Sequence, residues 1–338
     1  MKLLIRRLQS DWASWLAVAF IALLPFGRLS ELPLSILAVS VVFLARIADQ
    51  RARMRAAAAF VVPLFLCYWL PMVLSTFDSF DPQKSVVQSL AALRYLAAAL
   101  ALSVLLAAPS ARERVLRWTA WLLLFWAIDA FIQLFFGRDL FGIAMHPDRL
   151  NALFVKKYQF FGPTLAMLSP LVLEHARRNW RPLAWATSFA LLLGAVMIAG
   201  MRAGWLTMAL VLATYMLLML KRENRELRRT ALTIPALALI VLAVSYFASP
   251  LFQERLDVTR AFTAGEEQAL DASSMERVPI FRAALKMYRE HPVNGVGVRA
   301  FPAAYMVYAE PGDVHIEKSG GKSGATHAHN VVLEVMSD

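Results

Sequence analysis

Apolar stretches long enough to cross a lipid bilayer as helices recur along the first three quarters of the chain. A helix of roughly 17–25 apolar residues spans the hydrocarbon core of a membrane. The chain is 59% hydrophobic and only 17% charged, whereas soluble domains are roughly 45–50% apolar. The sequence therefore predicts an all-α, polytopic membrane helical bundle. Nine spans and the start of a tenth are expected at 12–26, 32–48, 56–76, 86–108, 115–136, 158–173, 182–201, 203–220, 230–249 and 330–338.

The basic residues predict which loops face the cytoplasm, because short cytoplasmic loops carry the excess of Lys and Arg. The N-terminus and every second loop after it are rich in basic residues, and the loops between them are poor in them. The expected cytoplasmic set is Lys2, Arg6, Arg7, Arg46, Arg51, Arg53, Arg55, Arg112, Arg114, Arg117, Arg177, Arg178, Arg181, Lys221, Arg222, Arg225, Arg228 and Arg229. With nine crossings from a cytoplasmic N-terminus, the long segment after the ninth span must lie outside.

Three regions follow from this pattern: a transmembrane domain over 1–249, an external loop or cap over 250–329, and the start of a membrane helix over 330–338. Within the cap, the stretch VPIFRAALKMYREHP places Val278, Phe281, Leu285 and Tyr288 at helical spacing. That spacing predicts an amphipathic helix. No cleavable signal peptide is expected, because many spans follow the first one.

The net charge of +11 could indicate a nucleic-acid partner, but the basic residues lie in short loops between spans rather than on one soluble surface. No nucleic-acid partner is therefore expected. The single cysteine, Cys67, lies within the third span and excludes an intramolecular disulfide.

Two arginines are expected at membrane depth, where a charged side chain costs ~2.5–3.5 kcal/mol on insertion scales and usually marks function or a structural pair. Arg202 lies at the outer turn between spans seven and eight, in AGMRAGWL, and Arg94 lies about two turns into span four. An arginine suits a diphosphate, because its planar fork donates paired hydrogen bonds and stays charged. The structural alternatives are snorkelling of Arg202 to the interface and a buried pair of Arg94 with an acid such as Asp129.

Arg277, directly before the amphipathic helix, could supply a second guanidinium to the same diphosphate. Its structural alternative is a surface salt bridge with Glu276 or Glu290. Together, these arginines would form a cationic pocket at the outer face of the membrane.

Two histidines, His327 and His329, stand where the external loop runs into the last apolar segment. A positioned imidazole at this border could act as a general base on an acceptor hydroxyl. The alternatives are a helix cap, a role that Asn330 could also fill, and a metal site. With no cysteine nearby and a glycine-rich run before the histidines, no metal and no cofactor are expected.

The chain resembles the bacterial O-antigen ligases, within the wider group of O-antigen ligase and polymerase membrane proteins. The resemblance is carried by DAFIQLFFGRDLFG after the fifth span, the Arg202 segment, the Arg277 segment followed by HPVNGVGVRAF, and HNVVL from His329. It implies a fold similar to the C-type glycosyltransferases. By that similarity Arg202 and Arg277 match two essential arginines and His329 matches the essential histidine, while Arg94 and His327 are further candidates for donor diphosphate binding.

The resemblance implies transfer of a glycan from undecaprenyl diphosphate to the lipid A core oligosaccharide, at the periplasmic face of the bacterial inner membrane. The mechanism expected is inverting and metal-independent. Two departures stand out: Met201 replaces a small hydroxyl residue common before the arginine, and the sequence stops before the glycine that completes the histidine motif. We therefore expect further C-terminal helices beyond Asp338.

Two alternatives remain open from the residues. An O-antigen polymerase, or another lipid-linked glycan transferase, would use the same donor with a different acceptor. A transporter of lipid-linked glycans would place charges through the membrane centre and show internal halves, and neither feature is evident.

Overall fold

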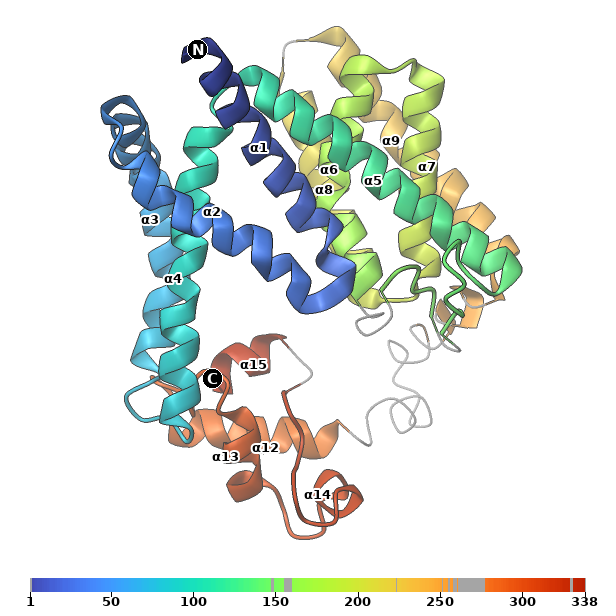
Figure 1. The fold of residues 1–338 in the computed structure, drawn as a ribbon. Helices are drawn as coiled ribbons and strands as arrows, with labels where there is room; N and C mark the ends of the chain where they lie inside the picture. Colours follow the sequence, from blue (N-terminus) through green and yellow to red (C-terminus); the bar gives the residue numbers. More distant parts are fainter. Residues whose placement is uncertain are drawn as a thin grey trace. The chain divides into compact units, whose positions relative to one another are not determined.

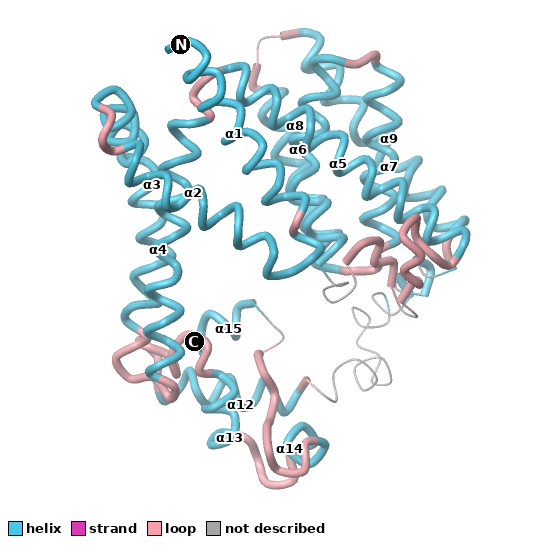
Figure 2. The backbone as a smooth tube through the Cα atoms, viewed as in Figure 1, coloured by secondary structure: helices cyan, strands magenta, loops and turns pink. Residues whose placement is uncertain are grey.

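The structure, a computed structural model, describes residues 2–146, 149–154, 160–222, 224–250, 252–254, 256–257, 260, 277–328 and 331–337. Helices account for most of this backbone, and the described residues form no β-strand (Figure 2). The predicted all-α class is confirmed.

Six helices are long and apolar enough to cross a membrane, namely Leu24–Leu44, Ala48–Leu74, Pro82–Leu105, Pro109–Phe136, Arg202–Leu220 and Arg225–Ala248. Shorter apolar helices cover Trp12–Ala22 and Pro182–Ile198. Large apolar side chains on them point outward; Phe60 is 73% exposed, Leu239 68% and Phe247 81%. Such surfaces are stable in lipid but not in water. The chain is therefore a polytopic membrane protein, and the number of nine crossings stays a prediction.

The chain forms two compact units, and each is made of separate parts of the sequence. Unit 1 comprises Met1–Leu37 and Leu105–Thr259, and unit 2 comprises Ala38–Val104 and Arg260–Asp338. Helix α2 (Glu31–Leu44) runs from one unit into the other.

Unit 1 is a helical bundle centred on α6, which packs against α5, α7 and α8 (Figure 1). Helix α9 covers α7 and α8, and α1 packs along α5. The core is filled from α5, α6 and α7 by buried side chains such as Trp126, Phe161 and Phe189. The elements are α1 (Lys2–Ala22), η1 (Leu24–Ser30), α5 (Pro109–Phe136), α6 (Phe161–Asn179), α7 (Pro182–Ile198), α8 (Arg202–Leu220) and α9 (Arg225–Ala248).

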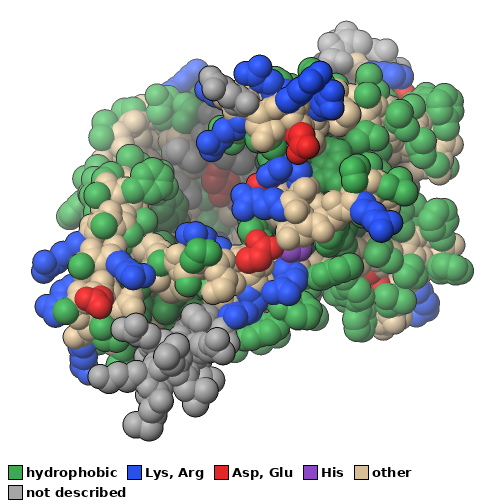
Figure 3. Space-filling model, turned by 90° about the horizontal axis from the view of Figure 1, so that it is seen from above, with side chains coloured by type: hydrophobic (Ala, Val, Ile, Leu, Met, Phe, Trp, Pro, Cys, Tyr) green, Lys and Arg blue, Asp and Glu red, His purple; other side chains and the backbone are tan. Residues whose placement is uncertain are grey.

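One end of unit 1 is strongly basic. The start of α5 and the loops joining α6 to α7 and α8 to α9 lie at this end, at the top of Figure 1. Viewed from above, the surface carries more Lys and Arg side chains than Asp and Glu side chains (Figure 3). The basic residues of these segments are Arg112, Arg114, Arg117, Arg177, Arg178, Arg181, Lys221, Arg222, Arg225, Arg228 and Arg229.

Unit 2 joins a long helical hairpin, α3 (Ala48–Leu74) and α4 (Pro82–Leu105), to a small helical cap. The cap comprises α12 (Val278–Glu290), α13 (Phe301–Tyr308), α14 (Val314–Lys318) and α15 (Val331–Ser337). Helix α12 packs on α13 and α15 around a second core that includes Met287, Phe301 and Tyr305.

The amphipathic helix predicted after Arg277 is present as α12, but the apolar residues whose spacing predicted it do not form its buried face. Its buried face is formed by Ile280, Ala283, Ala284 and Met287, whereas Val278 and Leu285 are each 37% exposed. Both sets follow helical spacing. The smaller side chains are buried because two alanines let α12 approach its neighbours closely.

Candidate functional site

Arg202 is the first residue of α8, and a close helix contact fixes where this helix begins. A Cβ atom at Gly204 would lie 3.2 Å from the backbone C of Gly162 and 3.2 Å from the N of Pro163, both in the first turn of α6. The indole N–H of Trp205 donates to the carbonyl of Met197 at 3.0 Å. These contacts hold the first turn of α8, while the Arg202 side chain stays exposed.

Enlarging Gly204 should therefore displace Arg202. We expect Gly204→Val to destabilise unit 1 by ~1–3 kcal/mol, the usual cost of overpacking. Gly204→Ala should destabilise it less. Ala203→Val is the matched control, because Ala203 is the exposed neighbour in the same turn. Thermal unfolding of the purified protein measures the difference, and equal midpoints for Gly204→Val and Ala203→Val would refute the close contact.

The loop that follows α5 is built on buried polar side chains. Gln133 accepts the backbone N–H groups of Asn151 at 3.2 Å and Ala152 at 2.8 Å through Oε1, and donates from Nε2 to the carbonyl of Ile143 at 3.2 Å. Asp129 accepts the Leu140 N–H at 2.9 Å. Asp129 and Gln133 both belong to the motif DAFIQLFFGRDLFG, which in the sequence is noted only for its resemblance to a family. The motif therefore supplies the side chains that accept hydrogen bonds from the backbone of this loop.

The same loop brings a further arginine to the start of α8. Asn151 accepts the His146 N–H at 2.8 Å through its side-chain oxygen, and between these residues the half-buried Arg149 directs its Nη1 to the sulfur of Met201. Arg149 thus touches the residue directly before Arg202. No local pattern in the sequence predicts this contact, because it joins positions 52 residues apart.

Arg277 is the N-cap residue of α12, and its carbonyl accepts the Phe281 N–H at 2.9 Å. Its side chain is exposed. Of the two acids considered as its partners, Glu290 lies at the opposite end of α12 and accepts the Tyr308 hydroxyl at 2.8 Å, while Glu276 lies outside the described residues.

The segment after α12 is held on the hairpin of unit 2 by hydrogen bonds that its backbone groups make with backbone and serine side-chain groups. Val296 donates to the Ser337 carbonyl at 2.6 Å and accepts the Phe80 N–H at 2.9 Å. Val298 donates to Ser75 Oγ at 3.1 Å and accepts the Ser85 hydroxyl at 2.7 Å. This Val296–Val298 clamp ties the hairpin and the end of α15 to one short segment.

A second set of contacts joins the hairpin and the cap. His291 Nδ1 lies 3.3 Å from Asp78 Oδ2, and His291 Nε2 lies 3.1 Å from the Tyr308 hydroxyl. Burial, together with the hydrogen bond to Glu290, raises the pKa of Tyr308 to about 12. Tyr308 therefore remains a neutral hydrogen-bond donor at physiological pH.

The segment leading to His329 is firmly packed, although His329 and Asn330 themselves lie outside the described residues. A Cβ at Gly324 would lie 2.2 Å from the Tyr305 ring, so the backbone passes directly against it. Ala328 is fully buried, and its N–H donates to Glu334 of α15 at 2.7 Å. His327 is exposed, with Nδ1 2.9 Å from the Thr326 hydroxyl.

Arg94 lies in α4 with its guanidinium carbon 5.2 Å from the centre of the Tyr95 ring. Its Nη2 donates to the Tyr95 hydroxyl at 3.4 Å. Asp129, considered above as its possible partner, uses one carboxylate oxygen to hold Leu140 within unit 1.

Asp313, an acid upstream of the two histidines, has a structural role. Asp313 caps α14 by accepting the N–H groups of His315 at 2.9 Å and Ile316 at 3.2 Å. Its other oxygen accepts the Tyr305 hydroxyl at 2.9 Å. Asp313 therefore serves the packing of the cap.

The candidate residues are divided between the two units. Arg202 and Arg149 belong to unit 1, whereas Arg94, Arg277 and His327 belong to unit 2. The structure brings Arg149 to the start of α8 and places the segment before His329 on the core of the cap.

Part of the chain matches the model of a known protein family. Residues 187–338 match the family model described as O-antigen ligase. The matched part contains Arg202, Arg277, His327 and His329, and Arg94 lies before it. No curated protein and no solved structure matches the chain.

Proposed function

This polytopic membrane protein carries an O-antigen ligase family domain over residues 187–338, and from that premise we propose that it is a glycosyltransferase. It transfers a glycan from undecaprenyl diphosphate to the lipid A core oligosaccharide, in lipopolysaccharide biosynthesis. The observation that carries the proposal is that the matched family domain contains Arg202, Arg277 and His329 in one stretch of chain.

The two arginines are proposed to hold the donor diphosphate. Each stands at the beginning of a helix, Arg202 as the first residue of α8 and Arg277 as the N-cap of α12. The N–H groups of a first helical turn lack intrahelical partners, and the helix dipole favours anions there. A diphosphate beside a guanidinium at a helix N-terminus would be stabilised both by the charge of the arginine and by the helix dipole.

His329 is the proposed general base. It removes the proton from the acceptor hydroxyl, whose oxygen attacks the sugar carbon attached to the diphosphate. The new glycosidic bond forms as the bond from that carbon to the phosphate oxygen breaks, so the configuration inverts. The electron pair of the broken bond passes to the diphosphate, and the arginines stabilise this charge in the transition state. Arg94 and His327 are proposed as additional donor contacts.

The proposed location is the inner membrane, with a cytoplasmic N-terminus and a periplasmic active site. The basic end of unit 1 supports this orientation, because basic loop residues face the cytoplasm. It predicts that position 226, beside the basic start of α9, is cytoplasmic and that position 322, in the cap, is periplasmic.

Cysteine labelling tests this orientation. Cys67 is exposed and is first replaced by alanine, after which Glu226→Cys and Lys322→Cys are introduced separately. An impermeant thiol reagent added to intact spheroplasts should label Lys322→Cys alone. Labelling of Glu226→Cys alone, or of both positions, would contradict the orientation.

Transfer by the purified protein tests the function. Lipid-linked glycan is supplied with either lipid A core or a second lipid-linked glycan chain as acceptor. We expect product with lipid A core. Product only with the second chain would identify a polymerase, an alternative that is also compatible with the family match.

The mechanism should not require a metal, because the arginines take over the stabilisation of the leaving diphosphate. Transfer should persist in EDTA. Loss of transfer in EDTA that one divalent ion restores, with the protein still folded, would contradict this mechanism.

A further inference from the structure

A cavity of about 500 Å³ opens at the basic end of unit 1, at the opposite end of this unit from Arg202. It is lined by the first turns of α5 and by the last turn of α6, through Pro109, Ser110, Arg112, Glu113, Leu116 and Arg178. A cavity of this size is within the range of small-molecule sites.

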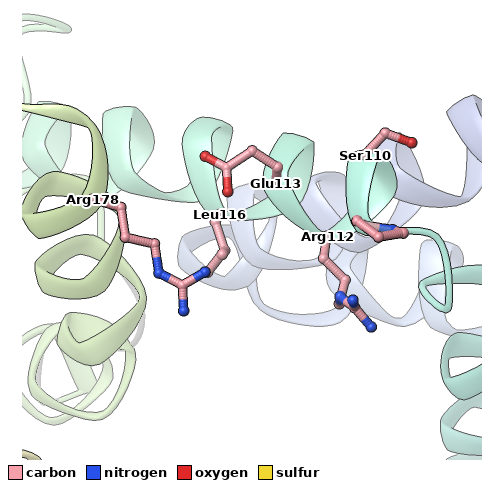
Figure 4. A pocket seen from close by; sticks show the side chains of 6 residues that line it. Ser110, Arg112, Glu113, Leu116 and Arg178 are labelled. Atoms are coloured by element: carbon pink, nitrogen blue, oxygen red, sulfur yellow. The ribbon is translucent and has the colours of Figure 1, made fainter. Parts of the chain in front are cut away.

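Two arginines give the cavity its character. Arg112 and Arg178 extend from neighbouring helices to the same side of the cavity, with Leu116 between them, while Glu113 points the other way (Figure 4). Two guanidinium groups around an apolar surface suit an anionic group that is attached to a hydrocarbon chain.

Among the described residues, the acidic side chains nearby leave Arg112 without a carboxylate partner, although Arg178 shares one. Glu113 lies 2.9 Å from His175 Nδ1 and accepts from Asn179 Nδ2 at 3.1 Å, so its carboxylate is directed to α6. Glu174 is shared between Arg177 at 2.8 Å and Arg178 at 2.6 Å. Within the described part of the chain no carboxylate pairs with Arg112. The cavity therefore has an excess of positive charge.

Tryptophans show the depth at which the cavity would lie in a membrane. Trp118 and Trp121 follow Arg112 on α5 and are 43% and 54% exposed. Trp118 pairs with Trp15 at a centroid distance of 5.4 Å, and Trp121 pairs with Trp180, the C-cap residue of α6, at 5.1 Å. Exposed tryptophans gather at the headgroup level of membrane proteins. Arg112 is about 9 Å further along the helix axis than Trp118, at the level of the lipid phosphates.

We propose that this cavity binds the phosphate of an anionic phospholipid headgroup, held between the guanidinium groups of Arg112 and Arg178. Basic pockets between membrane helices recognise such headgroups. An anionic lipid is favoured over a zwitterionic one, because the single carboxylate that lines the cavity is turned away and leaves no partner for an ammonium group.

Lipid retention by the purified full chain tests this site. Native mass spectrometry compares phosphatidylglycerol with phosphatidylcholine for the unaltered protein, Arg112→Gln, the double variant Arg112→Gln/Arg178→Gln, and the control Arg117→Gln. Arg117 is exposed on the same helix but does not line the cavity. At physiological salt, charges further than about 8 Å from the lipid are screened.

Arg112→Gln should weaken phosphatidylglycerol retention roughly tenfold, the effect of one lost charge-assisted hydrogen bond, and Arg117→Gln should leave it unchanged. Arg112 is the decisive single variant, since Arg178 also pairs with Glu174. An equal loss in Arg117→Gln, or equal retention of phosphatidylcholine, would overturn the site. Displacement of the lipid by inorganic phosphate at low concentration would reassign it to a soluble anion.

Discussion

Replacing His329 by alanine should abolish glycan transfer while leaving donor binding intact. As the proposed general base, His329 contributes to the chemical step by ~10²–10⁴-fold, whereas the diphosphate is assigned to the arginines. The measurements are product formation and binding of undecaprenyl diphosphate glycan to the same purified variant.

His327→Ala is the matched control, since it removes the other imidazole of the same segment. His327 is exposed beside Thr326, whereas His329 directly follows the fully buried Ala328. We therefore expect a much smaller loss of transfer. Equal losses at the two histidines, or normal turnover in His329→Ala, would remove His329 from the base role.

The arginine variants should fail in a different way. Arg202→Ala should weaken donor binding as well as transfer, because a lost charge-assisted contact is worth ~1.5–3 kcal/mol. Arg202→Lys should restore only part of the activity, since lysine keeps the charge but lacks the fork that binds two oxygens. If Arg202→Ala bound the donor normally, the diphosphate assignment would be wrong.

Replacing Gly297 by alanine should strongly destabilise unit 2. Gly297 has φ +102°, and a Cβ there would lie 2.1 Å from Ser79 Oγ and 2.9 Å from Ser79 Cα. Because the last of these atoms is backbone, a side-chain rotation cannot relieve the clash. We expect a loss of roughly 3 kcal/mol or more in the free energy of unfolding.

Gly320→Ala separates backbone strain from the clash. Gly320 has φ +64° but nothing within 4 Å of the added Cβ, so the cost should be only ~1–2 kcal/mol. Adding Ser79→Gly to Gly297→Ala should recover part of the stability, seen as a non-additive double-mutant cycle. Equal thermal midpoints for the two alanine variants would contradict the contact with Ser79.

The helices that pattern alone could predict are those with strong local signals. The apolar runs that became α3, α8 and α9 lie close to their predicted spans, because length and hydropathy are properties of consecutive residues. The existence of α12 followed in the same way. The buried face of α12 could not be predicted in this way, because the hydropathy of Ala283 and Ala284 does not distinguish them as core residues. Packing against α13 and α15 decides which face of α12 is buried.

The contacts that surround the candidate site could not be predicted from local sequence patterns. The contact of Arg149 with Met201 and the fit of Gly297 against Ser79 join residues far apart in the chain. Nothing in the spacing of either segment refers to its partner. The resemblance suggested Arg202, Arg277 and His329 as candidate site residues, but it could not indicate which neighbours position them.

The Val296–Val298 clamp also limits how the cap could be exchanged between related proteins. Its partners, Ser75, Phe80 and Ser85, come from the α3–α4 hairpin, which lies more than two hundred positions earlier in the chain. A cap transplanted from a relative with a different hairpin would lack the hairpin groups to which it hydrogen-bonds. Exchange of the cap therefore requires that two separate segments, residues 38–104 and 260–338, are inherited together.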